Sequence, residues 1–266
     1  MLKALSRKLV SISGRQHLEF LQRITTTNIF QNKKLLYSLF LDGSGRILFD
    51  TMIHLKDSVS YLETDRLNDL FEYLNSLIFR SDVSISVLHN KSVLWTKWEN
   101  FTLDKPSIAH VDPRLPQLGL RAICCDPSVD IEDGQYEYEN VLLINGIIEG
   151  SQNLKGRLPH IFNFDLIPDV ISRNKGCYTG QEYVMRLLNS PVRRRLLSVR
   201  NVPPGSKNLY SKKNIVGNVM QNRNGNAVAI VKLDSLQQGI FALNDSNNMQ
   251  EVDVLVPHWL KHRLTI

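Results

Sequence analysis

The most specific part of this sequence is the stretch Lys175-Gly176-Cys177-Tyr178-Thr179-Gly180-Gln181-Glu182. One glycine directly precedes the cysteine and another follows it by three residues. Glycine permits left-handed backbone and the close approach of another group. A short helix is predicted over residues 181–188, because Asn189-Ser190-Pro191 ends it. Cys177 therefore lies shortly before a helix N-terminus.

This setting favours a thiolate at Cys177. The positive end of the helix dipole and the ammonium group of Lys175 both stabilise negative charge on the sulfur. Arg186, one turn into the helix, adds to that field. A thiolate attacks electrophiles, binds metal or contacts a cluster. The alternative interpretation is a buried, inert cysteine in a turn. Cys124 and Cys125 have no such setting, and a structural role is predicted for both.

Bulk composition narrows the class of protein. The chain has 266 residues, 42% of them hydrophobic, with a net charge of +6 and a pI near 9.2. This is ordinary globular composition for one large domain or two modest ones. We find no dinucleotide-binding or P-loop motif, no nucleic-acid-binding module and no apolar stretch long enough to span a bilayer. Three cysteines without regular spacing exclude a disulfide framework and a self-contained zinc site.

Strand and helix patterns alternate through the first half of the chain, which predicts an α+β fold. Helices are predicted at 15–24 and 67–78, the second one capped by Thr64-Asp65. A hairpin turn is expected at residues 42–45. The strands at 83–88 and 92–98 are expected to be neighbours. The predicted strands are 9–13, 37–41, 46–55, 59–62, 83–88, 92–98 and 118–123.

The character of the sequence changes after about residue 192. Short strands separated by turns predict a small C-terminal β-barrel or sandwich, and Asn224-Gly225 is a strong hairpin signal. The strands are expected at 196–199, 215–220, 227–233, 238–243 and 252–256. The basic run Arg193-Arg194-Arg195 has two interpretations, either a solvated strand start or a patch for an anionic partner.

The N-terminus also has two interpretations. Residues 1–18 contain four basic residues and no acidic one, which is typical of a mitochondrial presequence. Residues 9–13 also alternate like a strand. We therefore expect about the first eight residues to be targeting sequence and the following residues to be folded.

The stretch at 175–182 resembles the signature of the YgfZ family in every residue. That family is a branch of the folate-binding fold shared with the aminomethyltransferase of the glycine-cleavage system, the T protein. Further likeness covers nearly the whole chain and weakens after residue 200. It includes Ile12-Ser13-Gly14, Thr26-Thr27-Asn28, Gly45-Arg46 and Asp112-Pro113-Arg114.

The resemblance implies two α+β lobes and a C-terminal barrel arranged as a ring around a central cavity. The folate-binding region would span residues 1–191, its first lobe about 1–100, and the barrel 192–266. The basic start favours the mitochondrial branch, whose members help A-type scaffold proteins make [4Fe-4S] clusters. This implies a matrix protein, monomeric alone and without classical turnover, that shares a cluster transiently with a partner. Its functional residues would be Cys177 with Lys175, Gly176, Tyr178, Gly180, Gln181, Glu182 and Arg186.

The resemblance also implies a candidate folate site. Glu149 falls where the pterin-binding glutamate of the T protein would fall, and Asp50 falls near that enzyme's acidic pair. Other interpretations are an exposed turn glutamate and a strand-end aspartate. The T protein has an aspartate in place of Cys177, and its acidic pair is reduced here to one residue. These departures favour an assembly factor over the two alternatives, a tetrahydrofolate-dependent one-carbon transferase and a non-catalytic interaction module.

Overall fold

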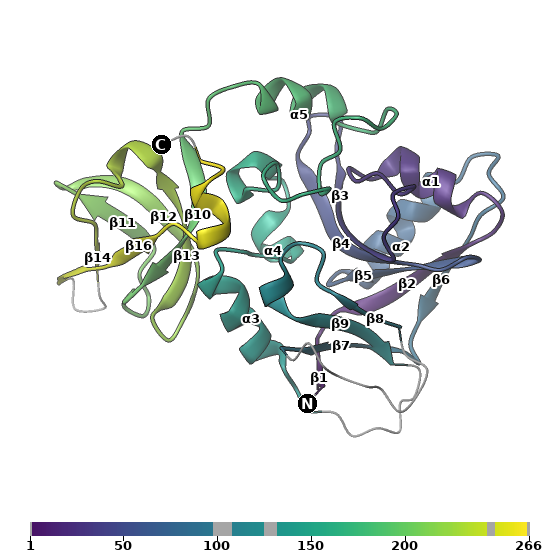
Figure 1. Ribbon diagram of the computed structural model, residues 1–266, viewed down its shortest axis with the longest axis horizontal. Coiled ribbons are helices and arrows are strands. Elements are labelled where there is room, and N and C mark those ends of the chain that lie inside the picture. Colours follow the sequence, from purple (N-terminus) through teal and green to yellow (C-terminus); the bar gives the residue numbers. More distant parts are fainter. Residues whose placement is uncertain (1, 98–107, 125–131, 244–247, 265–266) are drawn as a thin grey trace. The chain divides into compact units, whose positions relative to one another are not determined.

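The computed structural model describes residues 2–97, 108–124, 132–243 and 248–264 (Figure 1). The chain forms two compact units, each built from several stretches of sequence. The first unit comprises Met1–Tyr136, Gly150–Arg157 and Ile167–Met185, and the second comprises Glu137–Glu149, Leu158–Leu166 and Arg186–Ile266. Helices and strands occur in both, as expected for an α+β protein. Within the described residues, no helix has the length and apolar character needed to cross a membrane.

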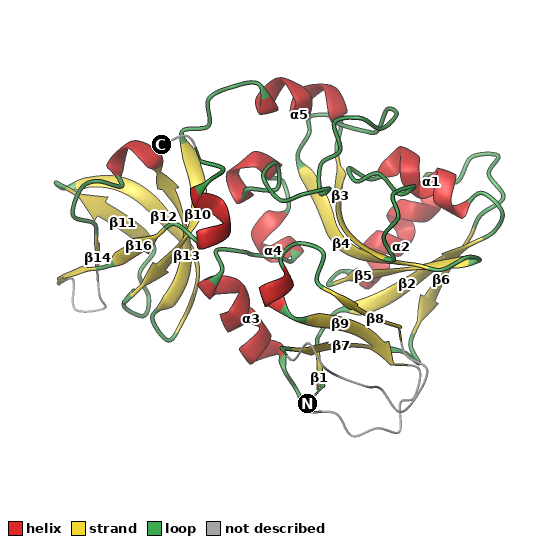
Figure 2. Cartoon of the chain, in the orientation of Figure 1, coloured by secondary structure: helices red, strands yellow, loops and turns green. Residues whose placement is uncertain are grey.

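The larger sheet of the first unit is antiparallel, with the strand order β3-β4-β5-β2-β6. Its strands are β2 (Lys8–Ser13), β3 (Leu35–Leu41), β4 (Ile47–Leu55), β5 (Val59–Thr64) and β6 (Ser84–Leu88). Two helices, α1 (His17–Ile24) and α2 (Leu67–Ser76), lie beside this sheet (Figure 2). Phe20 of α1 and Leu70 of α2 join Val10 and Ile12 of β2 in one buried cluster. The apolar residues that form the helical and strand patterns of the sequence thus pack together in a single core.

A smaller sheet completes the first unit, with the order β1-β7-β9-β8. Its strands are β1 (Lys3–Ala4), β7 (Ser92–Thr96), β8 (Ile108–Val111) and β9 (Leu120–Cys124). The expected pairing of the strands near 83–88 and 92–98 is wrong, because β6 pairs with β2 whereas β7 pairs with β1 and β9. Alternation identifies the two faces of a strand but does not identify its hydrogen-bonded neighbour. Residue 98, predicted to end a strand, lies outside the described residues.

The N-terminal residues are part of this fold. Lys3 and Ala4 pair with Trp95 and Leu94 of β7, and Arg7 is 5% exposed. The expectation that about the first eight residues are only targeting sequence is therefore not supported. Their basic, acid-free composition also suits a strand and a buried arginine that pairs with distant carboxylates.

The start of α2 differs from its predicted cap. The N-cap residue is Arg66, and no side chain caps the helix. Asp65 instead accepts hydrogen bonds at Oδ2 from the backbone N–H of Ser151 (2.7 Å) and from its hydroxyl (2.6 Å). Ser151 is the first residue of the short helix α4 (Ser151–Leu154). The carboxylate therefore serves a helix about 85 residues away in the sequence.

The second unit contains the barrel sheet, with the order β15-β14-β11-β12-β13-β10-β16. Most predicted strands are present, and β11 and β15 are additional. The Asn224-Gly225 hairpin is confirmed, with positive φ of 48° and 84°. The strands are β10 (Arg194–Arg200), β11 (Asn208–Ser211), β12 (Asn214–Arg223), β13 (Asn226–Lys232), β14 (Phe241–Leu243), β15 (Met249–Glu251) and β16 (Asp253–Leu255).

Helical segments outside the barrel sheet complete the second unit. Arg223 of β12 forms an ion pair with Glu139 of α3 (Gln135–Ile144), Nη2 to Oε2 at 2.7 Å. Trp259 of α6 (His258–Lys261) donates its indole N–H to the carbonyl oxygen of Asn145 (2.9 Å). The helix α5 (Gln181–Leu188) has the predicted bounds and continues from the first unit into the second. The second unit also contains the 3-10 turns η2 (Pro159–Phe162) and η3 (Leu233–Ser235), whereas η1 (Pro116–Leu118) belongs to the first unit.

Candidate functional site

Cys177 lies in an irregular loop of residues 175–180, which we call the Cys177 loop, directly before α5. Its thiol is free and exposed, whereas Cys124 of β9 is buried. The interpretation of Cys177 as a buried structural cysteine is therefore wrong, and the structural interpretation of Cys124 fits its place in the core. Cys125 lies outside the described residues.

Lys175 is buried and directed toward backbone. Its Nζ donates to the carbonyl oxygens of Thr25 (2.5 Å) and Thr27 (2.9 Å) and lies 5.0 Å from the ring centroid of Tyr178. Burial lowers the pKa of Lys175 to about 8. The predicted role of Lys175, stabilising a Cys177 thiolate, thus gains no support from its contacts, which are with carbonyl oxygens and an aromatic ring.

The two glycines of the loop serve different purposes. Gly180 has a φ of +80°, and a Cβ there would lie 2.5 Å from the carbonyl oxygen of Asp42 in the β3–β4 turn. Only glycine fits this left-handed backbone so close to the hairpin. Gly176 is exposed, and a Cβ added there would meet no other group within 4 Å. The expectation of a close approach is met at Gly180 and not at Gly176.

Tyr178 and Gln181 fix the end of the loop. The Oε1 of Gln181 accepts from the Tyr178 N–H (3.3 Å), and the Gln181 N–H donates to the Tyr178 carbonyl oxygen (3.2 Å). Tyr178 is 7% exposed, and burial raises its pKa to about 12. Within the described part of the chain, its hydroxyl has no hydrogen-bond partner.

Glu182 and Arg186 are both exposed and lie four residues apart on α5, so they share one face of the helix. Arg186 belongs to the second compact unit, and Cys177 belongs to the first. The predicted effect of Arg186 on the thiol therefore stays a prediction.

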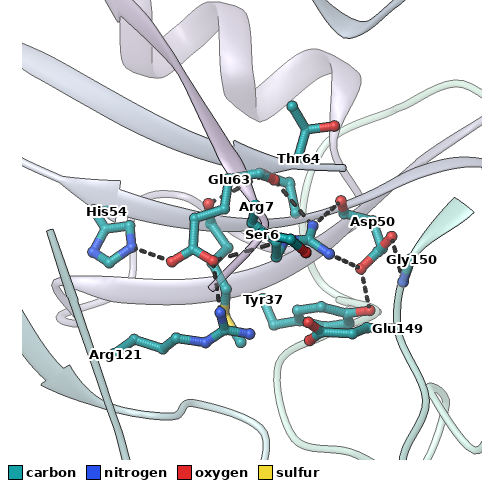
Figure 3. A network of polar contacts seen from close by, with 12 residues as sticks. Ser6, Arg7, Tyr37, Asp50, His54, Glu63, Thr64, Arg121, Glu149 and Gly150 are labelled. Atoms are coloured by element: carbon teal, nitrogen blue, oxygen red, sulfur yellow. Dashed lines mark hydrogen bonds and ion pairs between the residues drawn. The ribbon is translucent and has the colours of Figure 1, made fainter. Parts of the chain in front are cut away.

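Asp50 belongs to a buried polar network in the first unit (Figure 3). Its Oδ2 lies 3.2 Å from Arg7 Nη1 and accepts from the Tyr37 hydroxyl at 3.1 Å, and its Oδ1 accepts from the Gly150 N–H at 3.2 Å. Asp50 is 1% exposed. The alternative of a simple strand-end aspartate understates its role, because three groups distant in sequence converge on it.

Glu63 is the second carboxylate of the network. Its Oε1 lies 2.8 Å from His54 Nε2 and its Oε2 lies 3.0 Å from Arg121 Nη1, while Arg7 donates to its carbonyl oxygen (3.1 Å). All these side chains are buried. Burial by itself raises the pKa of Glu63, but the charge of Arg121, the hydrogen bond and charge of His54, and the charge of Arg7 together lower it below the ordinary value.

Most of this network has no direct signal in the sequence. Arg7, His54, Glu63 and Arg121 belong to strands or their edges and carry no motif. Strand alternation does not identify His54 and Glu63 as buried, because each directly follows a core residue, Ile53 and Leu62, and so lies on the opposite face of its strand. The distant partner that neutralises each charge follows only from the fold.

The candidate folate ligands fit poorly. Both carboxylate oxygens of Asp50 are already engaged by groups of the chain, so Asp50 offers no accessible acceptor to a pterin ring. Glu149 is half-buried and accepts at Oε2 from the Tyr138 hydroxyl at 2.7 Å. The exposed-turn interpretation of Glu149 is therefore also incomplete. We derive no folate chemistry from these residues.

A resident metal is not supported either. Among the described residues there is no group of three or more His, Cys, Asp or Glu side chains arranged to hold a metal ion.

One family model matches the C-terminal part of the chain, and one solved structure matches nearly the whole chain. Residues 193–262 match the family model described as CAF17, C-terminal beta-barrel domain. The crystal structure of the glycine cleavage system aminomethyltransferase T from Bartonella henselae superposes with a TM-score of 0.76 at 13% identity. The match covers 97% of this chain and 85% of that one, which establishes the fold.

Relatives in sequence indicate the branch. A protein of Pyricularia oryzae called "Iron-sulfur cluster assembly factor IBA57 homolog, mitochondrial" is 28% identical over 72% of this chain and 55% of its own length. Proteins of the same name in Mycosarcoma maydis and Neurospora crassa are 27% and 29% identical, over 71% and 73% of this chain and 54% and 52% of their own lengths. The chain therefore has the fold of the T protein and is similar in sequence to these fungal proteins. It spans about half the length of these curated relatives.

Proposed function

We propose that this chain acts in iron–sulfur cluster assembly in mitochondria and that Cys177 is its working group. The observation that carries the proposal is the exposed, free thiol of Cys177 in a loop held by buried Lys175 on one side and by the close packing of Gly180 on the other. The names of the fungal relatives supply the cellular process and the compartment. The resemblance of residues 175–182 to the YgfZ signature supports the choice of this thiol.

The cluster is the substrate in this proposal. A single cysteine cannot hold a cluster, which normally takes four cysteine-type ligands. Cys177 would therefore contact the cluster, its iron or a partner thiol transiently, with the remaining ligands on the partner. We infer that the isolated chain binds no stable cluster. A stoichiometric cluster on the monomer after anaerobic reconstitution would contradict this inference.

The finer part of the proposal concerns the partner and the product. We propose A-type scaffold proteins as partners, a [4Fe-4S] cluster as the product and the mitochondrial matrix as the location. The support is the resemblance of the motif at residues 175–182 to the family whose mitochondrial members work with such scaffolds.

The decisive test is aconitase activity in mitochondria that carry only Cys177→Ala. We expect loss of this [4Fe-4S] enzyme at a normal level of the variant protein. A [2Fe-2S] protein is the control for the earlier steps of assembly. Thr179→Ala is the matched variant, because Thr179 is exposed in the same loop. Full aconitase activity in Cys177→Ala would refute the role of the thiol.

The two other functions have less support. A folate-dependent transferase needs an available carboxylate, and Asp50 is engaged within the chain. Calorimetry with tetrahydrofolate on Glu149→Ala tests what remains of that prediction. In an interaction module based on the basic run, Arg195 would not face the partner, because it is buried and donates two hydrogen bonds of 2.5 and 2.9 Å to Asp165. Arg193 and Arg194 are exposed and stay candidates for an acidic partner.

A further inference from the structure

We propose that Lys175 is a positioning residue, which fastens the Cys177 loop to three consecutive threonines, residues 25–27, and so presents the thiol in one fixed arrangement. This inference deepens the proposed function, on which its biological meaning rests. It replaces the electrostatic role that the sequence suggested for Lys175 with a mechanical one. The evidence comes from both ends of the loop and from the threonines themselves.

The first anchor is the ammonium group of Lys175. It donates to the carbonyl oxygens of Thr25 and Thr27, which lie about 150 residues earlier in the sequence, at 2.5 and 2.9 Å. The ring of Tyr178 covers the same group at 5.0 Å. Burying a charged amine is costly unless hydrogen bonds compensate it, so the two carbonyl groups are what hold the ammonium group in this position.

The three threonines lie in a segment that is itself held in place by hydrogen bonds. All three are 0% exposed. The Thr26 hydroxyl donates to the Val170 carbonyl oxygen (2.7 Å) and the Thr27 hydroxyl to that of Asp169 (2.6 Å). The Ser172 N–H donates back to the Thr26 carbonyl oxygen at 2.9 Å. The segment leading into the Cys177 loop is thus fastened at several points before Lys175 is reached.

The second anchor lies at the other end of the loop. Gly180 approaches the β3–β4 turn so closely that a Cβ would overlap the Asp42 carbonyl oxygen. The turn itself is braced by Asp42, whose Oδ1 accepts from the N–H groups of Ser44 and Arg46, both at 2.9 Å. Between the two anchors, Gly176, Cys177 and Thr179 are exposed.

A fixed loop matters for a thiol that works by transient contact. Each rotamer-rich or loop group that has to be ordered on binding reduces affinity, and preorganisation removes that cost. A sulfur that shares a cluster with a partner must also reach the iron in a defined geometry. The contacts of Lys175 with the threonines, which we call the clasp, provide this order before the partner arrives.

The test uses a nitroxide spin label attached to Cys177 in a Cys124→Ser, Cys125→Ser background of the full chain. The electron paramagnetic resonance line shape reports how freely the label moves. We expect a slow-motion component in the parent protein, a shift to fast motion in Lys175→Met, and partial recovery of the slow component in Lys175→Arg. Lys33→Met is the control, since Lys33 bonds to Asp169 nearby but is 43% exposed.

Thr27→Val gives a second, independent variant, because it removes the hydroxyl bond to Asp169 and leaves Lys175 in place. We expect the fast component to grow here as well. A fast-moving label in the parent protein, or a parent-like line shape in Lys175→Met, would overturn the proposal. Equal mobility in Lys175→Met and Lys33→Met would overturn it too.

The spin-label spectra test the clasp and the aconitase assay tests the proposed function, so either proposal can be refuted without the other. The label reports on the chain alone, so a released loop in Lys175→Met supports the clasp even if Cys177→Ala leaves aconitase intact. In that case the proposed function fails and the clasp stands. If aconitase needs Cys177 but the label does not respond to Lys175, the function stands and the clasp is wrong.

Discussion

Arg7 and Asp50 form an ion pair inside the first unit, with Nη1 3.2 Å from Oδ2 and side chains 4% and 0% exposed. Arg7 also donates to the carbonyl oxygens of Asp50 (2.8 Å) and Glu63 (3.1 Å). One residue near the N-terminus thus joins two central strands of the sheet, β4 and β5. The pair engages Asp50 within the chain and fastens Arg7, directly before β2, to the sheet.

Replacing Arg7 by methionine leaves the carboxylate of Asp50 buried without this partner. Breaking a buried ion pair from one side typically costs about 3–5 kcal/mol. We expect Arg7→Met to lower the free energy of unfolding in urea by about that amount. Lys8→Met is the matched control, because Lys8 is the neighbouring residue and is exposed. A change in Arg7→Met as small as in the control would contradict the structural role of the pair.

Glu63 makes the stability of the first unit depend on pH. Its pKa is lowered in the folded chain, so its contribution is complete above the unfolded pKa of about 4.3 and is lost as pH falls through the folded value. We expect Glu63→Gln to be less stable than the parent at pH 7 and the difference to shrink below about pH 4. Urea unfolding at pH 7, 5, 4 and 3 measures this. A difference that stays constant over the series would show that the charge of Glu63 contributes nothing.

The sequence predicted the elements of the fold better than their partners. The periodicities of α1 and α2, the stop signal after α5 and the Asn224-Gly225 hairpin depend on neighbouring residues, which the sequence displays directly. The pairing of β7 with β1 and β9, and the use of Asp65 at α4, depend on contacts between distant residues. Hydrophobic patterns do not encode such contacts, because many pairings bury the same faces.

The candidate site shows the same division. The short motif identifies Cys177 and Gly180, but the exposure of the thiol and the contact of Gly180 with Asp42 follow only from the fold. The direction of Lys175 does not follow from it, because a lysine can reach a thiol or a carbonyl group equally well by length alone. Its direction depends on the carbonyl groups of Thr25 and Thr27, about 150 residues earlier, and no pattern in the sequence links these threonines to Lys175.

The glycines at 176 and 180 give opposite predictions for the same substitution. Gly180→Ala places a methyl group 2.5 Å from a carbonyl oxygen at a φ of +80°, so we expect a loss of at least about 1–2 kcal/mol in unfolding free energy. Gly176→Ala meets open space at an ordinary φ and should be neutral or stabilising by up to about 1 kcal/mol. Thermal or urea unfolding of the two variants measures the contrast. Equal effects would mean that the loop does not rest on the β3–β4 turn.

Replacing Tyr178 by phenylalanine tests whether the tyrosine hydroxyl takes part in function. The hydroxyl is buried, and in the described chain it has no hydrogen-bond partner, which is a cost that phenylalanine would not carry. We expect Tyr178→Phe to be neutral or about 1 kcal/mol more stable, because the ring that covers Lys175 is kept. Aconitase activity should be retained.

The pH profile of the same variant gives a second measurement. Burial raises the pKa of Tyr178 to about 12, against about 10 in the unfolded chain, so the unfolded state releases its proton first as pH rises. The parent protein should therefore lose stability relative to Tyr178→Phe between about pH 10 and pH 12. If Tyr178→Phe instead abolishes aconitase activity at unchanged stability, the hydroxyl serves the chemistry of Cys177, and the unpartnered oxygen marks where a ligand or partner group binds.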